Sequence, residues 1–181
     1  MRRSAVISVL ILLFVALAHT NAQAQSRPQT REGFFIGFGF GWGSLGCSTC
    51  GGTRTSGLAG YLKLGGTLSD QVLLGFETNG WVKSESGVTL SQNNASVVMY
   101  FYPNAESGFF IKGGFGGAEL RLELSSFGNL STNGYGLIGG LGYDARVGDN
   151  FSLTPYANVL YGGFDHESTS VLQLGLGLTW H

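Results

Sequence analysis

One short polar stretch near the end of the chain has the residue types of a hydrolytic site. Asp165, His166, Glu167 and Ser168 are consecutive, so an imidazole base and a hydroxyl nucleophile lie two positions apart. A serine nucleophile needs an adjacent base and an acid that orients the base. No Asp or Glu follows Glu167. The same residues also fit an exposed polar loop, and we expect that role rather than catalysis.

The two cysteines, Cys47 and Cys50, lie in a segment rich in Gly, Ser and Thr. Export through an oxidising compartment would favour a small loop disulfide. A redox-active pair would need a helix that begins after the first cysteine, and a zinc site would need two further ligands. The surrounding sequence offers neither. We therefore expect a disulfide, with no metal and no cofactor.

Five charged residues fall on the glycine-rich side of the alternating segments described below, where a closed barrel would bring them into its lumen. They are Lys63, Glu77, Lys112, Asp144 and Arg146. The interior of an eight-stranded barrel is just wide enough for side chains to fill it. We therefore expect a structural network in which buried charges neutralise one another. An ion path or gate is the alternative.

These charges lie on predicted strands, and the alternation of residue types that predicts the strands is clearest at the end of the chain, in LQLGLGLTWH (172–181). Successive side chains of a strand point to opposite faces of the sheet. One face of this segment is large and apolar, and the other is small or polar. The apolar face carries Leu172, Leu174, Leu176, Leu178 and Trp180.

Seven earlier segments alternate in the same way. The eight segments are 34–43, 58–66, 71–82, 94–102, 108–120, 134–146, 151–162 and 172–181. Their connections alternate between short turns and the longer polar stretches 47–55, 84–93, 121–132 and 163–170. Short turns on one side and longer loops on the other are typical of outer-membrane barrels. The sequence predicts an all-β, eight-stranded antiparallel up-and-down transmembrane β-barrel.

A soluble lipocalin-like barrel is the alternative, with its apolar face turned inward. The charged residues lie on the same face of the strands as the glycines. The opposite face has too many Phe, Leu and Trp side chains for so narrow a lumen. Aromatic residues also lie near the predicted strand ends, where membrane barrels carry interfacial girdles. They are Trp42, Tyr135, Tyr143, Tyr161 and Trp180. We expect the apolar side chains to face lipid.

The first residues have the composition of a secretory signal peptide. Arg2 and Arg3 precede the apolar run 5–18, and small residues at Ala22 and Ala24 predict cleavage after Ala24. An uncleaved anchor helix is the alternative, but the run is shorter than the roughly 20 residues that a spanning helix needs. The predicted organisation is a signal peptide at 1–24, a periplasmic lead-in at 25–33 and the barrel at 34–181.

Three segments carry a family resemblance. FYPNAESGFFIKGGFGG (101–117), SLTPYANVLYG (152–162) and the ending LQLGLGLTWH are similar to stretches of the bacterial outer-membrane β-barrel domain family, the small OmpA/OmpX-like barrels. The likeness covers essentially the whole chain after the signal peptide. It implies location in the cell outer membrane of a Gram-negative bacterium, in contact with outer-membrane lipid and lipopolysaccharide.

The last strand resembles the assembly signal of that family, in which a polar residue, a glycine and two hydrophobic residues have fixed spacing. Gln173, Gly175, Leu178 and Trp180 fit it, although His181 follows where the family usually ends on an aromatic residue. The resemblance implies periplasmic chaperones and the barrel assembly machinery as partners. Ten basic and eleven acidic residues leave no basic excess, so we expect no nucleic-acid partner.

The spacing of His166 and Ser168 also resembles the motif of outer-membrane lipid A 3-O-deacylases, which are eight-stranded barrels. Thr169 and Ser170 follow here, where that motif continues with Asn and Ala. A lipid-modifying enzyme therefore stays an alternative. We expect a small non-enzymatic barrel with a plugged lumen and a structural or surface-interaction role through its extracellular loops, whose ligand the sequence leaves open.

Overall fold

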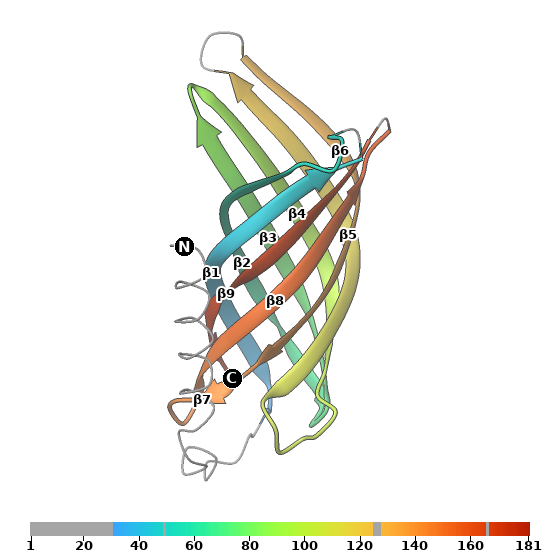
Figure 1. Cartoon of the computed structure of the whole chain (residues 1–181). Helices are drawn as coiled ribbons and strands as arrows, with labels where there is room; N and C mark the ends of the chain where they lie inside the picture. The colour runs from blue at the N-terminus through green and yellow to red at the C-terminus, as the bar shows by residue number, and fades with distance from the viewer. Residues whose placement is uncertain (1–30, 49, 125–127, 166) are drawn as a thin grey trace.

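The computed structural model describes residues 31–48, 50–124, 128–165 and 167–181. They form one antiparallel sheet that closes into a barrel (Figure 1). The strands are β1 (Phe34–Cys47), β2 (Arg54–Ser69), β3 (Val72–Glu85), β4 (Val88–Phe101), β5 (Phe109–Leu124), β6 (Gly128–Tyr143), β7 (Ala145–Arg146), β8 (Phe151–Gly163) and β9 (Ser168–Trp180). In these residues no helix has the length and apolar character needed to cross a bilayer. The predicted signal peptide and residues 25–30 of the lead-in lie outside the described residues.

Each strand pairs with its neighbours in the sequence, except that β6 and β7 do not pair with each other, and two further pairings close the barrel. β1 pairs with β9, and β6 pairs with β8. β7 continues β6 past a break at Asp144, because both pair with β8 in one register: Gly142 lies opposite Tyr156 and Ala145 opposite Leu153. Counting β6 and β7 as one strand leaves eight that span the barrel, which confirms the predicted fold class.

The apolar face of the strands points outward, as predicted. The exposed fractions of Phe38, Leu141 and Leu176 are 46, 49 and 57%. Large apolar side chains alternate with buried residues around the whole wall. A closed barrel with so much exposed apolar surface fits the hydrocarbon of a bilayer. The soluble lipocalin-like alternative is therefore wrong, because that fold would bury these side chains.

The strands are longer than the sequence predicts at the end of the barrel opposite Arg31 and His181. The segments expected to be the longer loops 84–93 and 121–132 are mostly strand. β3 and β4 meet in a tight turn at Ser86 and Gly87, whose φ angles of 52° and 81° are both positive, as a two-residue hairpin turn requires. The polar side chains in these stretches indicate contact with water, but the backbone pairing continues through them.

Candidate functional site

An ion pair lies at the centre of the lumen. Lys112 of β5 reaches past β4 to Glu77 of β3, with Nζ and Oε1 2.6 Å apart and both side chains almost fully buried. Asn79 Nδ2 donates a hydrogen bond to the same carboxylate oxygen at 2.9 Å, and the Tyr100 hydroxyl donates to the other oxygen. The carboxylate thus has three donors, which compensates much of the cost of burying it.

Lys63 is a second buried cation, and it is surrounded by aromatic rings. The Lys63 Nζ is 5.3 Å from the centre of the Tyr100 ring, 5.5 Å from that of Phe110 and 5.9 Å from that of Phe35. Ring faces attract cations at such distances. Large aromatic side chains therefore fill the lumen here and also stabilise the charge.

Asp144 is fully buried near the end of the lumen where His181 lies. It accepts hydrogen bonds from the Tyr102 hydroxyl at 2.7 Å and from Thr154 Oγ1 at 2.6 Å. The Nε2 atom of the final residue, His181, is 3.7 Å from its Oδ2. The break between β6 and β7 thus places a carboxylate where the last strand ends.

Arg31 closes this mouth of the barrel, a role that no sequence pattern predicted. Its guanidinium lies 3.7 Å from the centre of the Tyr102 ring and donates hydrogen bonds to the carbonyls of Ala105 and Ser107 in the turn between β4 and β5. Only 2% of the residue is exposed. Arg146, also buried, donates to the Asp149 carbonyl at 3.4 Å.

The opposite half of the lumen is filled by Trp81. Its indole nitrogen donates to the Gly43 carbonyl at 3.1 Å. A Cβ at Gly43 would lie 2.5 Å from the ring, and one at Gly57 would lie 3.0 Å from it. The two glycines are therefore needed to make room for the indole. Buried Leu45, Leu160 and Val171 belong to the same apolar cluster.

The structure buries the five charged residues that we expected in the lumen. Lys63, Glu77, Lys112, Asp144 and Arg146 are each at most 8% exposed. The structure brings Glu77 and Lys112 into direct contact and places Asp144 and Arg146 near the mouth. Their partners Tyr100, Tyr102 and Arg31 were missed, because an aromatic hydroxyl or a lead-in arginine has no distinguishing sequence pattern.

Charged residues near the ends of β3 and β5 that lie away from His181 pair with one another. Lys83 and Glu85 are 2.7 Å apart, and Arg121 lies 2.8 Å from Glu119. The hydrogen bond from Lys83 lowers the pKa of the Glu85 carboxyl, and the bond to Glu119 raises the pKa of Arg121. Both shifts favour the ionised forms of Glu85 and Arg121, as expected for groups on a surface in water.

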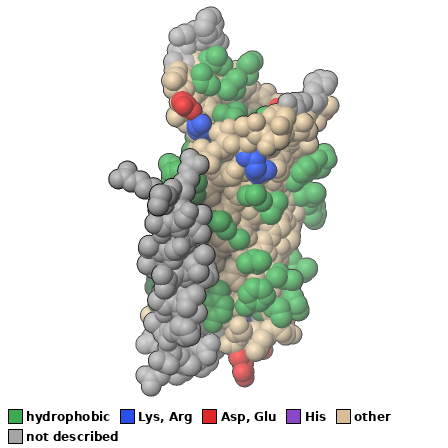
Figure 2. Space-filling view, in the orientation of Figure 1, with side chains coloured by type: hydrophobic (Ala, Val, Ile, Leu, Met, Phe, Trp, Pro, Cys, Tyr) green, Lys and Arg blue, Asp and Glu red, His purple; other side chains and the backbone are tan. Residues whose placement is uncertain are grey.

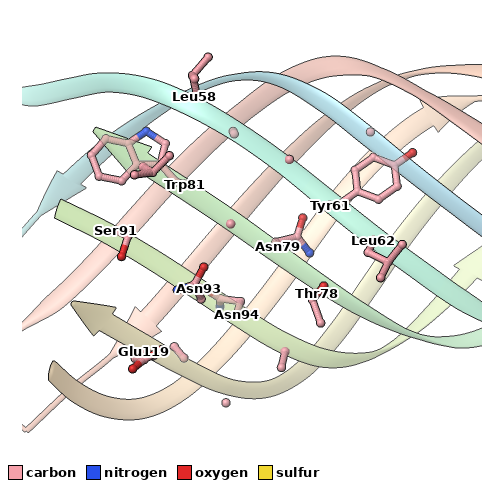
Figure 3. Close-up of a pocket in the computed structure, with 18 of the residues that line it drawn as sticks. Leu58, Tyr61, Leu62, Thr78, Asn79, Trp81, Ser91, Asn93, Asn94 and Glu119 are labelled. Atoms are coloured by element: carbon pink, nitrogen blue, oxygen red, sulfur yellow. The ribbon is translucent and has the colours of Figure 1, made fainter. Parts of the chain in front are cut away.

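A hollow lies against the barrel wall over β2 to β6 (Figure 3). Outward Leu58, Leu62 and Thr78 line it, together with the inward residues Asn79 and Trp81, which are almost fully buried. Its accessible surface therefore belongs to the outer wall. Within the described part of the chain, no group of three His, Cys, Asp or Glu side chains could hold a metal ion.

Two of the remaining predicted sites lie side by side at the end of the barrel opposite His181. A disulfide joins Cys47 and Cys50, whose Cα atoms are 5.2 Å apart, after the end of β1. Ser168 begins β9, and its backbone amide bonds to the Ser48 hydroxyl. His166 lies outside the described residues, so its proposed pairing with Ser168 stays a prediction.

The four residues of the predicted assembly signal all lie on β9. Gln173 points into the lumen, where Asn158 donates to it. Leu178 and Trp180 point out and are 40 and 39% exposed.

No family model and no curated protein matches the chain. Several solved structures, however, are similar to it. The attachment invasion locus protein Ail of Yersinia pestis is similar with a TM-score of 0.63 and 17% identity, over 82% of this chain and 99% of that one. The outer membrane protein Ail in a phospholipid bilayer nanodisc gives a TM-score of 0.54 and 15% identity, over 82 and 100%.

The fold is that of a small outer-membrane β-barrel. Neisserial surface protein A is also similar, with a TM-score of 0.58 and 17% identity over 83% of this chain and 98% of that one. At these identities the likeness concerns the fold. The exposed apolar wall of this chain is what that fold needs in a bilayer.

Proposed function

We propose that this chain is a non-enzymatic protein of the outer membrane, with a plugged lumen and a role in structure or surface contact. The observation that carries the proposal is a lumen filled at successive levels. Arg31 lies across the mouth near His181, the Glu77–Lys112 pair occupies the centre, and Trp81 fills the far half. Arg31 contacts the turn between β4 and β5, and each of the other two levels joins two strands that are not adjacent.

The side chains in the lumen support a plug because displacing each group of them costs free energy. Breaking a buried ion pair costs about 3–5 kcal/mol, and removing a large aromatic side chain from a core costs about 3–5 kcal/mol. Ions crossing the lumen would have to displace Trp81 and the Glu77–Lys112 pair together. Polar residues in this lumen therefore serve stability and specificity of packing.

Conductance of the purified, refolded protein in planar lipid bilayers tests the plug. We expect little steady conductance, and heat-modifiable migration on a gel would show that the same preparation is folded. A porin added to the same bilayers checks that channels can be detected. A large, stable open channel from the folded barrel would refute the proposal.

For biogenesis, we propose that periplasmic chaperones deliver the chain and that the barrel assembly machinery recognises Gln173, Gly175, Leu178 and Trp180. Leu178 and Trp180 lie on the outward face of β9 near its end, where they would contact outer-membrane lipid on the periplasmic side after insertion. Replacing Trp180 by Asp should reduce the heat-modifiable form in the outer-membrane fraction. Replacing His181 by Phe, which restores an aromatic ending, should leave it unchanged or increase it.

A further inference from the structure

The outward face of β1, β2 and β9 changes from apolar to polar at the end of the barrel opposite His181. The last outward apolar residues are Trp42 on β1, Leu58 on β2 and Leu172 on β9. The outward residues beyond them are Ser44, Arg54, Ser56, Ser168 and Ser170. Figure 2 shows mainly tan surface, which is backbone and uncharged polar side chains, where β1 ends. Because a charge on the lipid face is costly in hydrocarbon, this part of the wall lies at or above the membrane surface.

Arg54 lies across β1 and connects β2 with β9. Gly46 pairs with Arg54 on one side and with Ser170 on the other, and a Cβ at Gly46 would lie 2.7 Å from Arg54 Nη1. The guanidinium donates to the hydroxyls of Ser44 at 3.2 Å and Ser170 at 3.1 Å, and to the carbonyls of both residues. These bonds use most of the N–H donors that a guanidinium has. Arg54 therefore holds the strand ends together.

A hollow of about 290 Å³ lies beside this arginine, between the ends of β1, β2, β8 and β9 and the turn that contains the disulfide. We call it the hydroxyl hollow, because most of its lining residues carry a hydroxyl group. These residues are Ser48, Thr53, Tyr161, Ser168, Thr169 and Ser170. Ligand pockets range from about 300 to 1,000 Å³, so the hydroxyl hollow suits a small ligand.

Two of these hydroxyls are fixed by hydrogen bonds that they accept. Ser170 Oγ accepts from Arg54, and Ser48 Oγ accepts from the backbone amide of Ser168 at 3.1 Å. The Ser48 amide donates in turn to the Ser168 carbonyl at 2.9 Å, which fixes Ser48 relative to β9. A hydroxyl can donate a hydrogen bond while it accepts another. Both groups can therefore donate to an oxygen atom of a ligand.

Tyr161 adds an aromatic ring to the lining. It lies directly opposite Ser170 in the pairing of β8 with β9, so a ring and a hydroxyl are neighbours on the same face. The centre of its ring is 6.0 Å from that of Tyr135, whose side chain is also on the outer wall. The negative face of an aromatic ring attracts groups with partial positive charge, such as the C–H groups of a sugar ring.

The charges around the hydroxyl hollow do not favour an anion. Among the described residues that line it, Arg54 is the only charged one, and most of its donors are directed at Ser44 and Ser170. Two acidic residues, Asp165 and Glu167, come shortly before Ser168 in the chain. A neutral ligand with several hydroxyl groups fits this lining better than a phosphate or a sulfate.

We propose that the hydroxyl hollow binds a neutral sugar ring, whose oxygens pair with Ser48 and Ser170 and whose C–H face packs on Tyr161. The proposal rests on the surface-contact role given above and names the ligand class. Two sources offer the same chemistry. They are free carbohydrate outside the cell and the headgroup of a neutral glycolipid in the same membrane.

The experiment uses the full barrel in phospholipid nanodiscs, with glucose, galactose and N-acetylglucosamine as probes and ligand-observed NMR as the readout. We expect saturable binding of at least one of them, with a dissociation constant of roughly 1–10 mM. A sulfated glucose should bind no more tightly than glucose. In nanodiscs that also contain glucosyl diacylglycerol, loss of free-sugar binding would assign the glycolipid source, and unchanged binding would assign free carbohydrate.

Two serines that both accept from Arg54 provide a matched pair of variants. Ser170 lines the hydroxyl hollow and Ser44 does not. Ser170→Ala should weaken sugar binding about threefold or more, as the loss of one hydrogen bond predicts. Ser44→Ala removes an acceptor of the same guanidinium on the other side of the hollow and should change binding by less than about twofold.

The aromatic contact is tested in the same way. Tyr161→Leu should weaken binding about threefold or more, and Tyr161→Phe, which keeps the ring, should have the smaller effect. Tyr143 is an outward tyrosine at the opposite end of β6, so Tyr143→Leu should leave binding unchanged. All of these variants should keep heat-modifiable migration on a gel.

Four results would overturn the inference. They are absence of saturable binding of all three sugars by the folded protein, tighter binding of the sulfated sugar, equal effects of Ser170→Ala and Ser44→Ala, and equal effects of Tyr161→Leu and Tyr143→Leu. A folded, non-conducting barrel that binds no sugar would leave the proposed function standing. A large open channel would refute the proposed function instead.

Discussion

A charge placed on the lipid-facing wall should destabilise the protein in proportion to its depth. Leu141 points outward from β6 with 49% of its surface exposed, opposite Ile111 and Ala157. The outward residues of β6 between Tyr135 and Tyr143 are centred on Gly139, and Leu141 is the next outward residue after it. Leu141 therefore lies close to the middle of this span. Arg or Lys on a lipid face costs about 2–4 kcal/mol at the midplane and about 0–1 near the interfaces. We therefore expect Leu141→Arg to cost about 2 kcal/mol.

The same strand provides a matched control. Ser131 is on the same outward face of β6 but in the part of the strand that pairs with β5 and not with β8, where its side chain is exposed. Ser131→Arg should change stability by no more than about 0.5 kcal/mol, as is usual for surface substitutions. The difference between the two variants corresponds to roughly a tenfold or larger change in the unfolding equilibrium.

The adjacent position tests the opposite side of the wall. Gly140 faces the lumen, where a Cβ would lie 2.5 Å from Asn158 Oδ1 and 2.8 Å from the Ala157 carbonyl. Gly140→Arg should therefore prevent folding by steric conflict. At Gly139 a Cβ would meet no atom of the described residues within 4 Å, so Gly139→Leu should be tolerated.

Equilibrium urea unfolding in lipid vesicles, followed by tryptophan fluorescence, gives the free energies for variants that fold, and heat-modifiable migration identifies those that do not. Equal stability of Leu141→Arg and Ser131→Arg would show that Leu141 does not contact lipid. Normal folding of Gly140→Arg together with failure of Gly139→Leu would show that the assignment of faces is reversed.

Three further outcomes follow from the lumen and the loops. Lys112→Met leaves the Glu77 carboxylate buried without its cation and should cost about 3–5 kcal/mol; adding Glu77→Gln should recover much of that loss, and an equally unstable double variant would contradict the assigned pairing. Cys47 and Cys50 should resist alkylation until reduced, which mass spectrometry checks; labelling of both without reductant would exclude the disulfide. Cells that overproduce the protein should contain unmodified lipid A by mass spectrometry, whereas loss of an acyl chain that depends on Ser168 would establish the enzymatic alternative.

The alternation of side chains was enough to predict which face of each strand contacts lipid, because successive side chains of a strand point to opposite faces. The ends of the strands could not be predicted in the same way. Residues such as Ser91 and Arg121 are polar because they stand in water, yet their backbones pair as in the spanning part. Polarity reports the surroundings of a side chain, and strand pairing depends on the neighbouring backbone.

The sequence by itself determined the eight alternating segments, the outward apolar face and the group of charges that share the lumen. Only the tertiary structure decided that Glu77 pairs with Lys112, that Arg31 stacks on Tyr102 across the mouth, and that β6 ends in an unpaired edge. Periodicity assigns a residue to a face of its own strand. Contacts across a barrel depend on the relative stagger of strands far apart in the sequence, which closure of the sheet sets.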